Sequence, residues 1–237
     1  MLKVNNLKKR FGDFEAVKGI TFEVKKGEVL GFLGPNGAGK STTMRMITGF
    51  LPPSSGSAVI CGHDIQADPV AAKSCLGYLP ESAPSYRAMT VEEYLKFIAE
   101  VRGLNAKEAV DRVIERAKLS KVAKQTIETL SKGYRQRTAF AQAIIHDPSV
   151  LIMDEPTDGL DPNQKYTVRQ MIKEMSSEKA IVISTHILEE VDAVCTRALI
   201  IAGGEIKADG TPAELKAKDP SGDLATVFRN LTMEIKA

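Results

Sequence analysis

Directly after an apolar run at residues 29–33, the chain reads Gly34-Pro35-Asn36-Gly37-Ala38-Gly39-Lys40-Ser41-Thr42. This order fits the pattern G-x-x-x-x-G-K-[ST], in which glycines let backbone N–H groups converge on phosphate oxygens. Apolar residues at helical spacing follow in 40–50, so we expect a strand, a loop and a helix in the required order. In such a loop the lysine reaches the β- and γ-phosphates and the serine ligates magnesium. The nine residues are therefore predicted to bind a nucleoside triphosphate, with Lys40 as a catalytic residue and Ser41 as a metal ligand.

A second apolar run, residues 150–153, ends in Asp154 and Glu155. Two carboxylates at a strand end are weak evidence for a catalytic role on their own, because capping and solubility also place such residues there. Combined with the phosphate loop, they predict Asp154 in the shell of Mg²⁺ and Glu155 beside the attacking water. His186 follows another apolar run, residues 181–184, and by itself does not distinguish a surface residue from a site residue.

The rest of the chain places these motifs in an α/β fold. Alternation predicts antiparallel strands at residues 2–7 and 20–24, short strands near 58–61 and 76–79, and a hairpin at 199–202 and 205–209. Residues 86–148 read as helices, two of them opened by predicted capping boxes, Thr90 with Glu93 and Asn105 with Glu108. We expect one domain over 1–237. Its nucleotide-binding core, with an N-terminal antiparallel β subdomain, takes 1–85 and 149–218, an inserted helical subdomain takes 86–148, and a polar tail takes 219–237.

Composition narrows the possible partners. The 237 residues include 32 Lys and Arg against 30 Asp and Glu, so no strong field favours nucleic acid or lipid. No apolar run approaches the ~18 residues that span a bilayer, and the first residues lack an export signal, so we expect a cytoplasmic protein. Cys61, Cys75 and Cys195 have no metal-ligand spacing and are expected to be reduced core thiols.

A third motif, Leu130-Ser131-Lys132-Gly133-Tyr134, precedes a helical stretch. Serine and glycine at a helix start form a second anion site, which one nucleotide cannot easily share with the phosphate loop. This motif lies between the phosphate loop and Asp154-Glu155, and Gly159-Leu160-Asp161 and Ser184-Thr185-His186 follow. The combination resembles the ATP-binding cassette (ABC) ATPases over nearly the whole chain.

The resemblance implies that two cassettes pair head to tail, each ATP lying between the phosphate loop of one and the signature of the other. Hydrolysis would then belong to the dimer. The implied roles are γ-phosphate contact from across the dimer for Ser131 and Gly133, linkage of the two sites for Asp161, γ-phosphate contact for His186, and adenine stacking for Phe11 with Val17 beside it. The alternative for Phe11 is a phenylalanine that only packs its strand.

The sequence departs from the family pattern at two places. The usual signature is Leu-Ser-Gly-Gly-Gln, but Lys132 and Tyr134 occupy its third and fifth positions. Glu81 stands where the family usually has a glutamine that senses magnesium and leads into the permease-facing helices. A carboxylate can still ligate a metal, so Glu81 is predicted to be a magnesium ligand.

The motif variants look most like the exporter branch with type-2 permeases, including gliding-motility-type ATPases. We therefore expect an energy-coupling subunit that forms a homodimer, binds ATP and Mg²⁺, binds no nucleic acid, and attaches to the inner face of the membrane through a separate permease. Residues 82–89, with Tyr86 and Met89, are the expected docking segment. The alternatives are a soluble ABC ATPase acting on ribosomes or DNA, which usually has a coiled coil or two cassettes, and a regulator without turnover. A GTPase lacks support because no Asn-Lys-x-Asp motif is found, and a small-molecule kinase would leave the signature unexplained.

Overall fold

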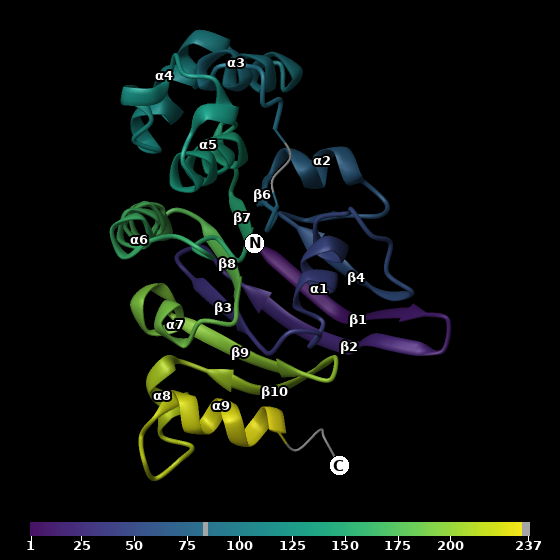
Figure 1. Cartoon of the computed structure of the whole chain (residues 1–237). Helices are drawn as coiled ribbons and strands as arrows, with labels where there is room; N and C mark the ends of the chain where they lie inside the picture. Colours follow the sequence, from purple (N-terminus) through teal and green to yellow (C-terminus); the bar gives the residue numbers. More distant parts are fainter. Residues whose placement is uncertain (83–84, 234–237) are drawn as a thin grey trace.

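The computed structural model describes residues 1–82 and 85–233, which form two β-sheets flanked by helices (Figure 1). The strands are β1 (Leu2–Phe11), β2 (Phe14–Val24), β3 (Val29–Leu33), β4 (Ser55–Ile60), β5 (His63–Asp64), β6 (Leu76–Leu79), β7 (Val150–Asp154), β8 (Ala180–Thr185), β9 (Arg197–Ala202) and β10 (Glu205–Gly210). The α-helices are α1 (Lys40–Ile47), α2 (Pro69–Ser74), α3 (Val91–Val101), α4 (Ala106–Arg116), α5 (Lys132–Ile144), α6 (Pro162–Ser176), α7 (Leu188–Val194), α8 (Pro212–Lys216) and α9 (Leu224–Met233).

The larger sheet has the order β10-β9-β3-β8-β7-β6, with parallel pairs throughout except at the β10 edge. Successive residues of its central strands enter two different cores: Leu151 and Met153 face one, Val150 and Ile152 the other. Because helices pack on one face and α1 with the smaller sheet packs on the other, these strands read as continuous apolar runs in the sequence. The predicted mixed α/β fold is confirmed.

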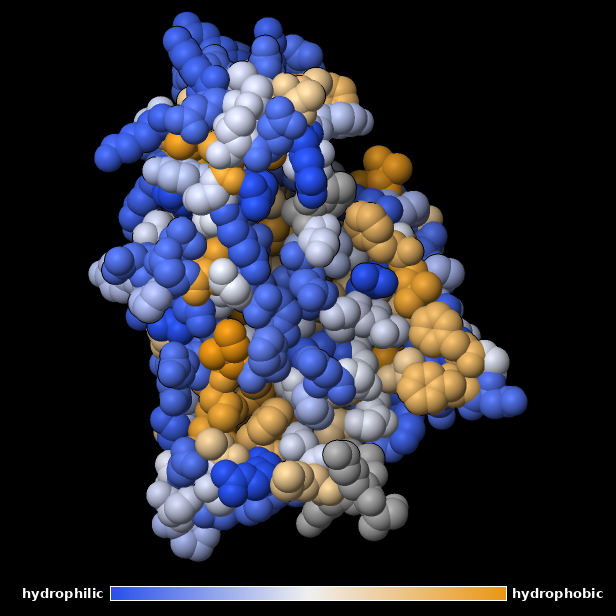
Figure 2. All heavy atoms as spheres, viewed as in Figure 1, coloured by the Kyte–Doolittle hydropathy of each residue, from blue (hydrophilic) through white to orange (hydrophobic). Residues whose placement is uncertain are grey.

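The smaller sheet has the order β2-β1-β4-β5, and its β1–β2 pair is antiparallel, as predicted. Phe11 and Phe14 are register partners at the tip of this hairpin. The hairpin extends to one side of the molecule in Figure 1, and hydrophobic residues gather at the surface on that side in Figure 2. It therefore carries two aromatic rings out beyond the core.

The helices α3, α4 and α5 gather at one end of the molecule, at the top of Figure 1. The capping box of Thr90 and Glu93 is confirmed, with both reciprocal hydrogen bonds at the start of α3. The second predicted box is wrong, because the Asn105 side chain makes no capping hydrogen bond. Glu108 still lies in the first turn of α4, where a carboxylate complements the positive helix end.

Two further predictions need correction. The helix after the phosphate loop ends at Ile47 rather than at residue 50, because Gly49 turns the chain and the N–H of Phe50 donates to the Arg45 carbonyl at 2.9 Å. The predicted polar tail contains α9, whose Leu224 and Val227 are buried against the core beside β9. Residues 234–237 of that tail lie outside the described residues. The three cysteines are free, as predicted, but only partly buried.

Within the described residues, no helix combines the length and the apolar character that crossing a bilayer requires.

Candidate nucleotide-binding site

The phosphate loop joins the end of β3 to the start of α1. Gly39 adopts φ 103°, in the left-handed region that favours glycine, and a Cβ there would meet the Ala16 carbonyl oxygen at 2.7 Å. Glycine at this position lets the loop pass close to β2 and enter α1 directly at Lys40. The first N–H groups of α1 have no partner within the helix, so together with the loop they favour an anion.

Lys40 is buried at the base of this loop. Its Nζ donates to the carbonyl oxygens of Gly34 at 2.7 Å and Pro35 at 3.2 Å, and it lies 3.9 Å from Oε1 of Glu155. Burial lowers the pKa of the lysine, and the carboxylate of Glu155 opposes that shift. The loop thus holds a cation where phosphate oxygens would enter.

Glu155 follows β7 directly and pairs with His186, which follows β8. Oε1 of Glu155 lies 3.0 Å from Nδ1 of His186, and the other carboxylate oxygen is buried with no hydrogen-bond partner among the described residues. The backbone of Glu155 has φ 50°, an uncommon conformation for a non-glycine residue, and its N–H donates to the Ser184 carbonyl. A half-buried carboxylate aimed into a cavity, with one oxygen free, can accept a proton from water.

Hydroxyl and carboxylate oxygens converge next to the phosphate loop. Ser41 Oγ donates to Oδ1 of Asp154 at 3.4 Å, and Asp154 is buried with 2% of its surface exposed. Glu81 lines the same cavity. Mg²⁺ prefers such oxygen ligands and usually takes the remainder from water and phosphate, so the residues fit this ion. No cluster of three or more His, Cys, Asp and Glu side chains suited to a metal occurs in residues 1–82 and 85–233.

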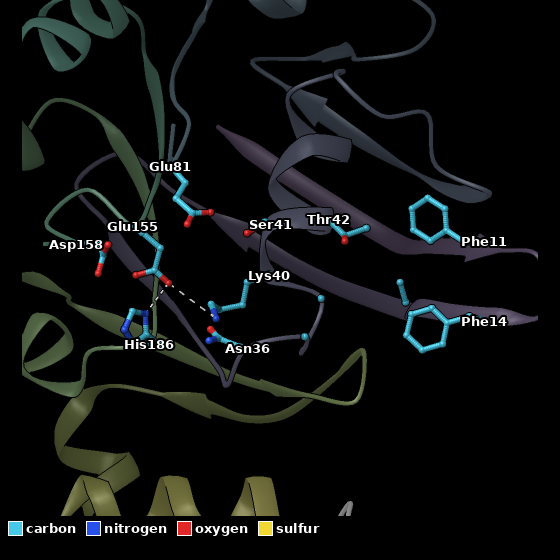
Figure 3. Close-up of a pocket in the computed structure, with 13 residues that line it drawn as sticks. Phe11, Phe14, Asn36, Lys40, Ser41, Thr42, Glu81, Glu155, Asp158 and His186 are labelled. Carbon is cyan, nitrogen blue, oxygen red and sulfur yellow. Dashed lines mark hydrogen bonds and ion pairs between the residues drawn. The ribbon is translucent and has the colours of Figure 1, made fainter. Parts of the chain in front are cut away.

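Lys40, Ser41, Glu81, Glu155 and His186 line one cavity of about 520 Å³, shown in Figure 3. Phe11 and Phe14 lie on one side of the phosphate loop, whereas Glu81, Glu155, Asp158 and His186 gather on the other (Figure 3). The full lining comprises Phe11, Phe14, Ala16, Asn36, Gly37, Gly39, Lys40, Ser41, Thr42, Glu81, Glu155, Asp158 and His186. One end of the cavity is aromatic and exposed and the other is charged, as a nucleotide would require.

Some predicted residues do not line the cavity. Val17 is fully buried in the core, and its neighbour Ala16 lines the cavity instead. Gly34 and Pro35 contribute carbonyls to Lys40, and Ala38 is buried in the loop. Asp154 lies behind Ser41.

Sequence reasoning missed Phe14, Ala16 and Asp158, which line the cavity. A signal was available for Phe14, because a hairpin turn at Gly12 places it opposite Phe11. No comparable pattern points to Asp158.

The signature residues lie apart from the cavity of their own chain. Ser131 caps α5, where its Oγ accepts from the N–H of Tyr134 at 3.4 Å, and Gly133 packs against the Gln164 side chain. Asp161 caps α6, its Oδ1 accepting from the N–H of Gln164 at 2.9 Å. None of Ser131, Gly133 and Asp161 is among the residues that line the cavity.

A second cavity, of about 640 Å³, lies between α3 and the region of α1 and α2. Phe50, Tyr78, Ile98 and Val101 give it apolar walls. Its charged lining residues in the described part of the chain are all cationic: Arg45, Lys73 and Arg102. Ser82 belongs to this lining, whereas Tyr86 packs its ring against Phe97 and Met89 packs against the core. Residues 83 and 84 of the predicted docking segment lie outside the described residues.

A phosphate loop between a buried parallel strand and a helix, with an acid and a histidine at neighbouring strand ends, defines a P-loop nucleoside triphosphatase. The profile of the family described as ABC transporter matches residues 17–158, and the chain belongs to that family. It is an ATP-binding and ATP-hydrolysing subunit of an ABC transporter.

Named relatives and solved structures agree with this assignment. The chain is 42% identical over 219 residues to the linearmycin resistance ATP-binding protein LnrL of Bacillus subtilis, covering 91% of this chain and 70% of that protein. It is 35% identical over 232 residues to the Nod factor export ATP-binding protein I of Cupriavidus metallidurans, covering 96% and 77%. A structure described as the ATP binding subunit of an ABC transporter superposes with a TM-score of 0.87 at 29% identity, covering 98% of this chain and 99% of that one.

A dimeric cassette, MJ0796, bound to ADP and Pi, has a TM-score of 0.79 at 24% identity, with 89% and 98% covered. At 24% identity, this similarity supports the fold of the chain alone.

Proposed function

We propose that this chain is the ATPase of an exporter, in which two copies close head to tail around two ATP molecules and move a separate type-2 membrane permease. The observation that carries the proposal is the division of the site. Lys40, Glu155 and His186 share one cavity, whereas Ser131, at the exposed start of α5, contributes nothing to it. A second copy would supply the missing half.

The two halves of the site suit the two sides of a bound triphosphate. Lys40 and the loop N–H groups bind the phosphates from one side, and the start of α5 offers Ser131 and N–H groups from the other. Glu155 accepts a proton from the attacking water, and His186 holds that carboxylate in place. Asp161, which caps α6 close to Gly133, would meet the partner across the interface.

Magnesium is the metal that the oxygen ligands favour. Ser41 and Asp154 would hold it, with Glu81 in reach of the same cavity. Bound Mg²⁺ would neutralise part of the phosphate charge.

Residues 1–85 and 149–218 would act as the nucleotide-binding core and residues 86–148 as the helical subdomain. The cationic groove between them is the proposed docking site for a permease helix at the inner membrane face. Apolar walls with Arg45, Lys73 and Arg102 suit an amphipathic helix that carries a carboxylate. Charge reversal at Lys73 should lower co-purification with the permease while leaving ATP binding unchanged.

Export is favoured by the relatives, since LnrL is named for resistance and the Nod factor protein for export. The type-2 assignment rests on the motif variants at Glu81 and Lys132. Reconstitution with the partner permease tests export, because import of the cargo would contradict it. The fold of that permease tests the type-2 assignment.

The division of the site has a direct test. Ser131→Arg should abolish ATP-driven dimerisation, because a bulky cation would replace the serine that faces the partner's γ-phosphate. Binding of ATP by the monomer should persist, since Ser131 does not line the monomer's cavity. Unchanged dimerisation of this variant, measured by sedimentation, would contradict the shared site.

A further inference from the structure

Lys132 occupies the third signature position and reaches toward a loop of its own chain. Its Nζ lies 3.8 Å from Oδ2 of Asp158, three residues after Glu155. The same ammonium lies over Gly159, where a Cβ would collide with it. Gly159 has φ 63°, so glycine both permits the turn and leaves the space that the lysine occupies.

A second contact joins the same two segments. Gln136, one turn further along α5, donates from Nε2 to the Pro156 carbonyl at 3.1 Å. The start of α5 is thus tied at two points to the loop of residues 156–161. One of these contacts carries opposite charges.

Asp158 also lines the nucleotide cavity, where Figure 3 shows it beside Glu155 and His186. Three carboxylates, those of Glu81, Glu155 and Asp158, line the cavity together with one lysine, Lys40. A triphosphate entering this cavity meets their negative charge. Pairing with Lys132 compensates the charge of Asp158 from outside the cavity.

We propose that Lys132 is a positioning residue that acts in cis: through Asp158 it supports nucleotide binding in its own subunit. The inference rests on the proposed function, in which the signature serves the partner's nucleotide. The lysine would then link a subunit's own cavity to the segment that the subunit presents to its partner. The affinity for ATP should depend on the Lys132–Asp158 pair more strongly than the affinity for ADP, because ATP carries one more phosphate and therefore more negative charge.

The expected effect is small because both side chains are exposed, 56% for Lys132 and 51% for Asp158. Exposed ion pairs of this kind support changes of about 1.5- to 5-fold in an equilibrium constant. The effect should also shrink as salt screens the pair.

The experiment compares wild type, Lys132→Gln, Lys132→Arg, Asp158→Asn and the double variant Lys132→Gln/Asp158→Asn. Affinities for the β,γ-imido analogue of ATP and for ADP are measured by calorimetry, at protein concentrations where sedimentation shows a monomer. Lys107→Gln, at an exposed lysine on α4, is the matched control and should bind as wild type does.

Lys132→Gln should weaken binding of the ATP analogue about 1.5- to 5-fold and binding of ADP less, with the loss reduced at high salt. Lys132→Arg should restore the affinity. Asp158→Asn should bind at least as tightly as wild type, and adding Lys132→Gln to it should change nothing further. An unaltered affinity in Lys132→Gln, or an equal loss in the Asp158→Asn background, would overturn the inference.

Failure here is separable from failure of the proposed function. These affinities concern the monomer, whereas the shared site is tested by dimerisation of other variants. If the nucleotide affinity of the monomer does not depend on Lys132 but the protein still dimerises with ATP, only the cis role of Lys132 is contradicted.

Discussion

Nδ1 of His186 lies 3.0 Å from Oε1 of Glu155, although 30 residues separate them in the chain. The parallel register of β7 and β8, in which Asp154 pairs with Ser184, brings the two strand ends together. The imidazole therefore fixes the orientation of the carboxylate that faces the nucleotide cavity.

We expect His186→Ala to lower kcat by about 100-fold, the range found when one preorganised hydrogen-bonding group is lost from a catalytic site. Nucleotide binding should change little, because Lys40 and the phosphate loop are untouched. Steady-state ATPase assays combined with nucleotide titration measure both quantities. A normal kcat would show that the contact with Glu155 has no catalytic role.

Phe11 is 50% exposed at the aromatic end of the cavity. If it stacks on the base, Phe11→Ala should weaken ATP binding by about 5- to 150-fold, because stacking contributes about 1–3 kcal/mol. Inorganic triphosphate, which has no base, should bind as before, and Phe11→Tyr should retain the affinity for ATP. Equal losses for ATP and triphosphate would favour the alternative in which Phe11 only packs its strand.

A buried ion pair joins α6 to α7. Glu190 is 1% exposed, and its Oε1 accepts from Nε and Nη2 of Arg169 at 3.1 and 2.6 Å. Arg169→Met should lower the free energy of unfolding by about 3–5 kcal/mol, because it leaves a buried carboxylate without its cation. Urea denaturation measures the change.

The control for this pair is Glu189→Gln, which alters a carboxylate that is 83% exposed. It should change stability by less than about 0.5 kcal/mol. Arg169→Met/Glu190→Leu should recover most of the loss, and a double variant as unstable as Arg169→Met would contradict the explanation.

His146 predicts an acid-sensitive step in stability. Its Nε2 donates to the Leu76 carbonyl at 3.0 Å, since a carbonyl can only accept, and its Nδ1 is buried without a partner among the described residues. Burial lowers the pKa of this histidine to about 4. The folded protein therefore binds the proton less readily than the unfolded chain, whose histidine titrates near 6.5.

Stability linked to His146 is present above pH 6.5 and is lost as the pH falls toward 4, by up to about 3 kcal/mol. Denaturation series at several pH values should show this slope in wild type and a shallower one in His146→Gln, whose amide can still donate to Leu76. Parallel pH profiles for the two proteins would rule out the histidine as the cause.

Much of the fold could be predicted because its signals are local. The buried strands β3, β7 and β8 are continuous apolar runs, and the capping box of Thr90 and Glu93 indicates the start of α3. The sequence did not predict α9, because its apolar residues are interspersed with polar ones and its buried face is defined by packing against β9 and α8. The Asn105 box failed because a side chain at a capping position need not make the bond.

In the site, too, residues with a local sequence pattern could be predicted and residues placed by tertiary packing could not. The phosphate loop could be predicted from spacing, since each of its residues has a separate chemical reason. Asp158 and Ala16 could not, because they reach the cavity through the packing of a loop and a hairpin. The contact between Lys132 and Asp158 likewise depends on how α5 packs against residues 156–161.

The composite nucleotide site is tested most directly by sedimentation of the Glu155→Gln protein. Without the carboxylate that accepts the proton, this variant should bind ATP, lose at least about 100-fold in turnover, and sediment as a stable dimer with ATP but as a monomer with ADP. A variant that hydrolyses ATP normally, or that remains monomeric with ATP at every concentration, would contradict the account.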